Sequence, residues 1–182
     1  MRAEEHAEHL KLALRTYEGP LLRYVLRITG DLDRARDVVQ EAFIKLCKQK
    51  FSHVEDHLAE WLFTVCRNRA LDLLKKEGRL QPFDENAPRF YQDPAPGPSK
   101  QMETKEDSEG VLRLMEKLPA IQQEVIRLKF QEDLSYKEIS QITKLSVSNV
   151  GFLIHIGIRT MREKMKNDPA FAAELREKNY GT

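Results

Sequence analysis

Two helical patterns separated by a tight turn occupy residues 134–153, which read LSYKEISQITKLSVSNVGFL. Ser135 and Glu138 have the spacing of a capping box, in which the side chain of each residue accepts a hydrogen bond from the backbone N–H of the other. Ser146 can cap the second helix. Because apolar residues recur on one face of each pattern, the stretch predicts two short helices that cross at a wide angle, as in a helix-turn-helix.

The second helix of this pair suits the major groove of DNA, which admits an α-helix and presents distinguishable base edges. Asn149, near its start, can pair bidentately with adenine, and Lys144 and Arg159 suit phosphates. The alternative is a plain helical hairpin with no nucleic-acid role. The candidate contacts are the polar and basic residues of the turn and second helix: Lys144, Ser146, Ser148, Asn149, His155 and Arg159.

Two blocks of helical periodicity flank a proline-rich segment. Five of the eight prolines fall between Gly78 and Glu106, and such a composition favours an extended linker. No run of β-branched residues alternates with polar ones between turn signals, so we expect an all-α protein. The predicted organisation is two small helical domains, residues 1–79 and 108–166, joined by a flexible linker at 80–107 and followed by a C-terminal extension at 167–182.

The first block predicts three helices around one core. Gly19-Pro20 is expected to interrupt the first helix, because proline breaks a helix interior. Asp31 is a good N-cap for the second helix. A less regular loop, residues 48–56, precedes the third helix, whose apolar face includes Trp61.

Charge is distributed locally in this chain. The 182 residues include 30 Lys and Arg against 29 Asp and Glu, so the net charge of +1 supplies no general attraction to nucleic acid. A basic excess does occur in the third helix, where Arg67, Arg69, Lys75 and Lys76 lie close together. Phosphates are the natural partner of such an excess, and a solvated helix end that complements the helix dipole is the alternative.

The second helix presents an acidic and amide-bearing face. Asp37, Gln40 and Glu41 point away from its apolar stripe, with Phe43 at the edge. Such a face suits docking on a basic protein surface better than contact with phosphates. A merely solvated helix face is the alternative.

Several classes of protein are not expected. Cys47 and Cys66 each lie in an apolar helical pattern, as reduced thiols do, and no membrane span or signal peptide is expected, so we predict a soluble, cytoplasmic protein. His53, His57 and Cys47 do not make a closed ligand set, so no metal site and no cofactor are expected. No phosphate loop, nucleophile elbow or paired-carboxylate signature is present, so we expect no catalytic residues and no enzyme.

Several motifs together resemble the sigma-70 family of RNA polymerase sigma factors. Residues 118–130 (LPAIQQEVIRLKF), 134–140 (LSYKEIS) and 146–150 (SVSNV) resemble the family's C-terminal domain, which binds the −35 promoter element. Residues 22–31 (LRYVLRITGD), 35–43 (ARDVVQEAF) and 60–74 (EWLFTVCRNRALDLL) resemble its −10-binding domain. The matches stand in the same order as in the family. No other sigma domain is expected in the sequence, and in this respect the chain resembles the extracytoplasmic-function (ECF) group.

The resemblance implies a transcription initiation factor that binds core RNA polymerase and directs it to promoter DNA with −10 and −35 elements. The residues 37–43 face is expected on the clamp helices of the β′ subunit, with the β flap as a second polymerase contact, and an anti-sigma factor is an expected partner. A loop that captures an extruded base stabilises melted DNA without ATP. The residues expected at the −10 element are those of this loop and the third helix: Phe51, His53, Arg67, Asn68, Arg69, Asp72, Lys75 and Lys76.

The second helix of the predicted helix-turn-helix departs from the family pattern. Gly151, Leu153 and Ile156 stand where related factors usually carry basic residues, and Lys144 replaces a common turn glycine, which predicts altered turn geometry. Two alternatives therefore stay open: a sigma-like adaptor or decoy that no longer reads DNA, and a stand-alone helix-turn-helix repressor.

Overall fold

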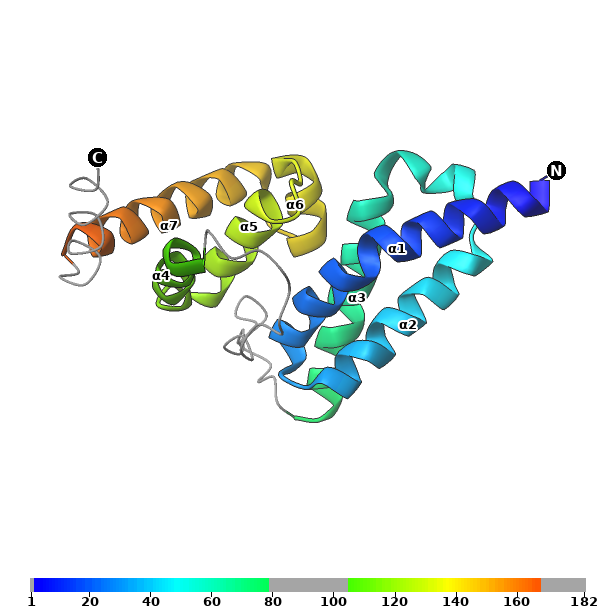
Figure 1. Cartoon of the computed structure of the whole chain (residues 1–182), viewed down its shortest axis with the longest axis horizontal. Coiled ribbons are helices and arrows are strands. Elements are labelled where there is room, and N and C mark those ends of the chain that lie inside the picture. The colour runs from blue at the N-terminus through cyan, green and yellow to red at the C-terminus, as the bar shows by residue number, and fades with distance from the viewer. Residues whose placement is uncertain (1, 79–104, 168–182) are drawn as a thin grey trace.

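A bundle of three long helices forms the N-terminal part of the molecule (Figure 1). The computed structural model describes residues 2–78 and 105–167, and every regular element in these two ranges is a helix. Helices α1 (Arg2–Thr29), α2 (Leu32–Lys48) and α3 (Leu58–Lys76) each pack against the other two. Two 3₁₀ helices, η1 (Phe51–His53) and η2 (Glu55–His57), connect α2 to α3.

A second bundle contains α4 (Lys105–Glu116), α5 (Ala120–Phe130), α6 (Tyr136–Thr143) and α7 (Val147–Asn167). The other three helices all contact α7, the longest of the four. The all-α prediction is therefore confirmed for the described residues. Most of the predicted linker (80–107) and of the predicted C-terminal extension (167–182) lies outside the described residues. Only residues 105–107 of the linker and residue 167 of the extension lie within them.

Helix α1 passes through Gly19-Pro20 without ending, so the expected interruption there was wrong. Proline lacks the N–H that would bond to the carbonyl of Thr16, and its ring crowds that carbonyl. The helix persists because Ala13 before the proline and Leu21 and Val25 after it are all buried. Tertiary packing on both sides outweighs the local preference of the dipeptide.

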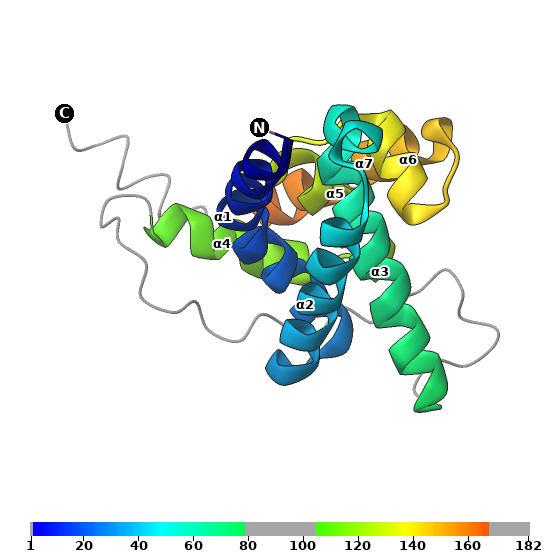
Figure 2. The same ribbon diagram turned by 90° about the vertical axis from the view of Figure 1, so that its right-hand side faces the viewer.

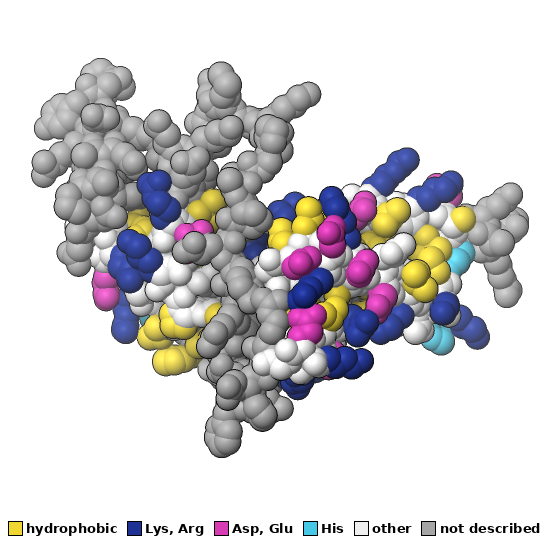
Figure 3. Space-filling view, turned by 90° about the horizontal axis from the view of Figure 1, so that it is seen from below, with side chains coloured by type: hydrophobic (Ala, Val, Ile, Leu, Met, Phe, Trp, Pro, Cys, Tyr) yellow, Lys and Arg dark blue, Asp and Glu magenta, His cyan; other side chains and the backbone are white. Residues whose placement is uncertain are grey.

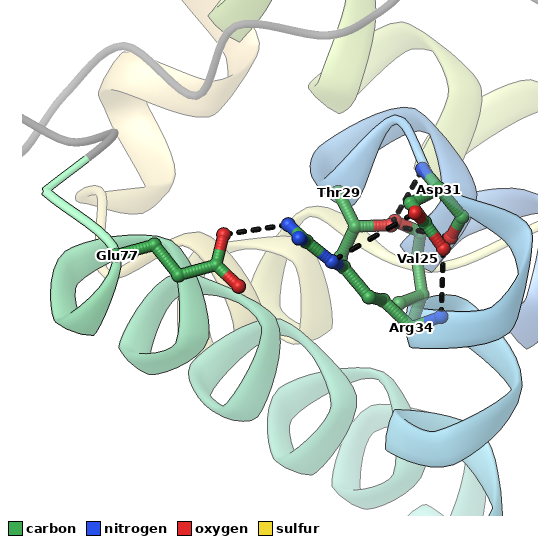
Figure 4. Close-up of polar contacts among 5 residues, drawn as sticks. All are labelled: Val25, Thr29, Asp31, Arg34 and Glu77. Atoms are coloured by element: carbon green, nitrogen blue, oxygen red, sulfur yellow. Dashed lines mark hydrogen bonds and ion pairs between the residues drawn. The ribbon is translucent and has the colours of Figure 1, made fainter.

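The turn between α1 and α2 is closed by side chains, as Figure 4 shows. Asp31 caps α2 as predicted, and its carboxylate accepts a hydrogen bond from the backbone N–H of Arg34 at 3.0 Å. The Thr29 hydroxyl donates to the Val25 carbonyl at 3.1 Å. Arg34 also pairs with Glu77, just beyond α3, so one side chain ties the α1–α2 turn to the end of the third helix.

The helix-turn-helix pattern is confirmed by α6 and α7. Ser135 and Glu138 form the predicted capping box, and the Ser146 hydroxyl oxygen accepts from the backbone N–H of Asn149 at 3.2 Å. The Ser140 hydroxyl closes the turn by donating to the Leu145 carbonyl at 2.6 Å. The predicted polar capping residues therefore mark both helix starts.

Lys144 takes the backbone conformation of the glycine that it replaces. Its φ of 63° and ψ of 20° lie in the left-handed region. Glycine usually supplies this conformation at the end of a helix, so Lys144 carries the strain of an L side chain in that region, and the altered turn geometry stays a prediction.

Gly157 allows α7 to approach α5 closely. A Cβ atom built at this position would lie 2.6 Å from the Cδ1 atom of Ile126. At Gly151 the nearest atom to such a Cβ belongs to Tyr136, at an ordinary 3.4 Å. A larger residue would therefore clash at position 157, where α7 packs closely on α5, but not at position 151.

The two bundles touch each other. Helix α6 packs against α3, and both views show the helix-turn-helix beside the upper half of the first bundle (Figures 1 and 2). The buried apolar residues of the two bundles belong to one cluster. The arrangement is therefore closed, with the second bundle seated on α1 and α3.

Candidate nucleic-acid interface

Helix α3 presents one exposed polar stripe. Asn68, Asp72, Lys75 and Lys76 are all exposed, and their spacing places them on one face. An amide, a carboxylate and two ammonium groups in a row can hydrogen-bond base edges and pair with phosphates. Four of the six residues predicted on this helix are thus brought together on its surface.

Arg67 lies on the opposite side of α3, in the interior. Its side chain is 6 % exposed and its Nε donates to Oε1 of Glu124 at 2.8 Å, while Nη2 donates to Oε2 at 3.3 Å. The Tyr24 hydroxyl donates to the same Oε1 at 2.6 Å. Arg67 is thus brought to a carboxylate of the second bundle and away from the exposed stripe.

The surroundings of Arg67 and Tyr24 perturb the pKa of both groups. Burial disfavours the charged guanidinium, but the facing Glu124 carboxylate and the Tyr24 oxygen together outweigh it, so the pKa of Arg67 is raised. Burial and the negative charge of Glu124 raise the pKa of Tyr24 well above its usual value. Tyr24 therefore stays a neutral hydrogen-bond donor and Arg67 stays a cation.

Arg69 connects α3 to α2. Its Nε and Nη2 atoms donate to the two carboxylate oxygens of Glu41 at 2.6 and 2.9 Å. This hydrogen bond lowers the pKa of Glu41 and raises that of Arg69. A predicted DNA-binding residue and a predicted polymerase-binding residue thus pair with each other.

The loop residues meet aromatic neighbours from α1. Phe51 stacks on His9 with ring centroids 4.5 Å apart and contacts His6 edge-on at 6.4 Å, whereas His53 is exposed. The sequence reasoning missed both histidines of α1. The aromatic character of the two histidines was the only hint in the sequence, because about 40 residues separate them from the loop and no local pattern links the two segments.

The predicted polymerase face of α2 is present, with one difference. Asp37 and Gln40 are exposed, whereas Phe43 is half-buried and packs on the core. Ile44, which was not predicted, is 48 % exposed and shares the face of Asp37 and Glu41. Seen from below, acidic side chains gather over this bundle, with basic and apolar side chains between them (Figure 3).

The outer face of α7 carries an aromatic residue that the sequence reasoning also missed. Ser148, His155 and Arg159 are exposed on one face, and Phe152, 61 % exposed, lies between them. Asn149 is exposed beside this stripe. Phe152 lies four residues after Ser148, and this helical spacing was the signal that could have revealed it. The two remaining predicted residues, Lys144 and Ser146, are exposed at the turn.

The described residues contain neither a membrane-spanning helix nor a cluster of metal-binding side chains. In the ranges 2–78 and 105–167, no helix is long and apolar enough to span a bilayer. Within the same part of the chain, no three His, Cys, Asp or Glu side chains are grouped as metal ligands would be.

Comparison with known proteins identifies the family. The model described as Sigma-70 region 2 matches residues 13–80, and that described as Sigma-70, region 4 matches residues 108–161. The ECF RNA polymerase sigma factor SigM of Bacillus subtilis is 30% identical over 134 residues, covering 73% of this chain and 80% of SigM. The RNA polymerase sigma factor YlaC of the same organism is 26% identical over 166 residues, covering 90% of this chain and 94% of YlaC.

A solved structure has the same fold. It is that of the sigma factor RpoE in complex with the anti-sigma factor NepR from Bartonella quintana, with a TM-score of 0.61, 21% identity, and coverage of 91% of this chain and 99% of that one. The chain therefore belongs to the ECF group of sigma-70 factors, the transcription initiation factors that bind RNA polymerase and direct it to promoter DNA.

Proposed function

We propose a division of labour between the two bundles in promoter recognition. The first domain, residues 1–79, binds core polymerase and the −10 element, and the second, residues 108–166, binds the −35 element. The observation that carries the proposal is the exposed polar stripe on α3, which lies within the region 2 match. The factor acts without a cofactor and in the cytoplasm, where its polymerase is.

At the −10 element, Asn68 and Asp72 contact bases of the separated strand, and Lys75 and Lys76 contact its phosphates. The stacked Phe51 and His9 offer an aromatic surface to a base turned out of the duplex. Stacking of a base on an aromatic ring is worth about 1–3 kcal/mol, the same scale as the cost of unstacking it. Capture of an extruded base by these rings therefore supports strand opening without ATP.

At the −35 element, the stripe of α7 enters the major groove. Ser148, Asn149 and His155 reach base edges, and Arg159 reaches a phosphate, as does Lys144 at the turn. Phe152 makes an apolar contact to a thymine methyl group, which compensates in part for the scarcity of basic residues on this helix.

The polymerase contact is the α2 stripe of Asp37, Gln40, Glu41 and Ile44, with the clamp helices of β′ as its partner and Phe43 supporting it from the core. An exposed isoleucine ringed by carboxylates and an amide fits a basic surface with an apolar centre. An anti-sigma factor is a further partner, supported by the similar fold of a sigma factor solved with one.

Run-off transcription tests the proposal. Purified chain, core polymerase and the DNA upstream of its own gene should give transcripts that begin at discrete sites. A decoy would bind core polymerase without initiating, and a repressor would protect DNA in the absence of polymerase. Either result would overturn the proposed function.

A further inference from the structure

The closed arrangement is held by a polar contact to which both bundles contribute. Tyr24 and Arg67 come from α1 and α3, and both donate to the Glu124 carboxylate of α5, at 2.6 and 2.8 Å. All three side chains are buried, and Glu124 is fully so. We name these three residues the latch.

A second acidic residue faces the same surface of α1. Glu132, after α5, is half-buried, and burial raises its pKa while the nearby Arg23 and Arg27 oppose that shift. Acidic groups of the second bundle thus meet cationic groups of the first at two places. The contact is therefore complementary in charge.

We propose that the latch is an autoinhibitory contact, which keeps the free factor closed and withholds Arg67 and the adjoining face of α3 from DNA. The inference rests on the proposed function of α3. While Glu124 occupies the guanidinium and α6 packs on α3, Arg67 is not free to engage a promoter, whereas the outer stripe of α7 stays exposed.

The energetics of a buried ion pair suit a reversible contact. Removing both charges from water carries a desolvation penalty that can cancel their mutual attraction, so an intact buried pair adds little net stability. When two domains separate, both groups regain water, unlike a pair broken inside one domain. The intact latch therefore adds little to the free energy of the closed state, whereas removal of one partner leaves a buried charge without its counter-ion.

Opening exchanges one anionic partner for another. In the open factor, Arg67 can pair with a phosphate in place of the Glu124 carboxylate, since a guanidinium forms bidentate contacts with either group. Promoter binding by Arg67 therefore competes with closure, whereas the α2 stripe proposed for polymerase stays exposed in the closed form. The apparent affinity for −10 DNA is then the intrinsic affinity multiplied by the fraction of factor that is open.

Small-angle X-ray scattering of the free, full-length chain tests the latch directly. Glu124→Gln keeps the shape of the side chain and removes its charge, and we expect a larger radius of gyration than for the wild type. Tyr24→Phe, which keeps the ring on Phe63, should give a smaller increase. The exchange of charges in Arg67→Glu/Glu124→Arg should restore the compact form. Helix content by circular dichroism must stay unchanged in each variant.

Arg34→Gln is the matched control, because it breaks an ion pair that lies within the first bundle, between α2 and the residue just beyond α3. It should leave the radius of gyration unchanged. If Glu124→Gln remains as compact as the wild type while fully helical, the latch is refuted. Expansion by the control as much as by Glu124→Gln would also refute it.

Affinity for single-stranded DNA of the −10 element separates this inference from the proposed function. If about one molecule in ten is open, Glu124→Gln should bind a single-stranded −10 oligonucleotide about tenfold more tightly than the wild type. Equal affinities would show that the latch does not inhibit. Failure of the wild type to bind polymerase or initiate would overturn the proposed function and leave the scattering result standing.

Discussion

Arg69 of α3 holds Glu41 of α2 through two parallel hydrogen bonds, 2.6 and 2.9 Å long. The pair joins the helix proposed to bind the −10 strand to the helix proposed to bind polymerase. Because the fork of a guanidinium fixes the carboxylate in orientation, the pair orients Glu41 and Arg69 relative to each other. Both side chains remain partly exposed, so the pair contributes more to geometry than to stability.

The Glu41–Arg69 pair predicts a small loss of stability in acid. The hydrogen bond from Arg69 lowers the pKa of Glu41, so its contribution is complete above the unfolded-state pKa, about 4.3, and is lost as the pH falls through the lower folded-state pKa. Glu41→Gln should cost less than about 1 kcal/mol at pH 7 and almost nothing at pH 2. Urea unfolding at both pH values measures this, with Arg36→Gln as the exposed-pair control. A loss that stays constant with pH would contradict the assignment.

Asn68→Ala should impair open-complex formation more than binding to core polymerase. The side chain is exposed on α3. Within residues 2–78 and 105–167 it makes no hydrogen bond whose loss would disturb the bundle. Permanganate footprinting of melted thymines measures opening, and fluorescence anisotropy measures polymerase binding. Equal loss in the two assays would refute the role of Asn68.

Phe152→Ala should weaken discrimination at one thymine of the −35 element, with a loss of about 1–3 kcal/mol, the range for one mismatched base pair. Transcription from a library of promoters randomised at the −35 element measures this. Phe130→Ala is the matched control, because Phe130 on α5 is 62 % exposed and Phe152 is 61 % exposed. Equal effects of the two changes would indicate a general loss of apolar surface.

Lys144→Gly should stabilise the second bundle while weakening DNA binding. Lys144 adopts φ 63°, which costs an L residue about 1–2 kcal/mol, and the greater freedom of glycine in the unfolded chain offsets only part of the gain from removing this strain. Thermal unfolding should therefore shift upward. The lost ammonium should also reduce the salt dependence of DNA binding. A lower melting temperature would contradict the strain at this turn.

The two thiols should react very differently. Burial raises the pKa of Cys66 to about 12, so at pH 8 it is neither ionised nor accessible, whereas Cys47 is exposed. Native protein should consume one equivalent of a thiol reagent quickly, and unfolded protein two. Cys47→Ser should abolish the fast phase, and a fast phase that persists in this variant would place Cys66 at the surface.

The residues alone were enough to predict the helical class and most helix starts. Three helices are capped by side chains that accept a hydrogen bond from the backbone N–H three residues later: those of Asp31, Ser135 and Ser146. Because this range is short, such caps can be predicted from the sequence. Gly19-Pro20 failed as a local signal, because burial of residues on both sides kept α1 continuous.

The partners of the charged residues came from the tertiary structure. Arg67 pairs with a carboxylate 57 positions away and Arg69 with one 28 positions away, and no local pattern encodes such distances. One clue was present, because Arg67 shares the apolar stripe of Phe63, Ala70 and Leu74. Helix formation depends on neighbours within one or two turns, whereas a buried charge depends on whatever the fold brings to it. The sequence therefore determined the helices, and the packing of the two bundles decided which arginines stay on the surface.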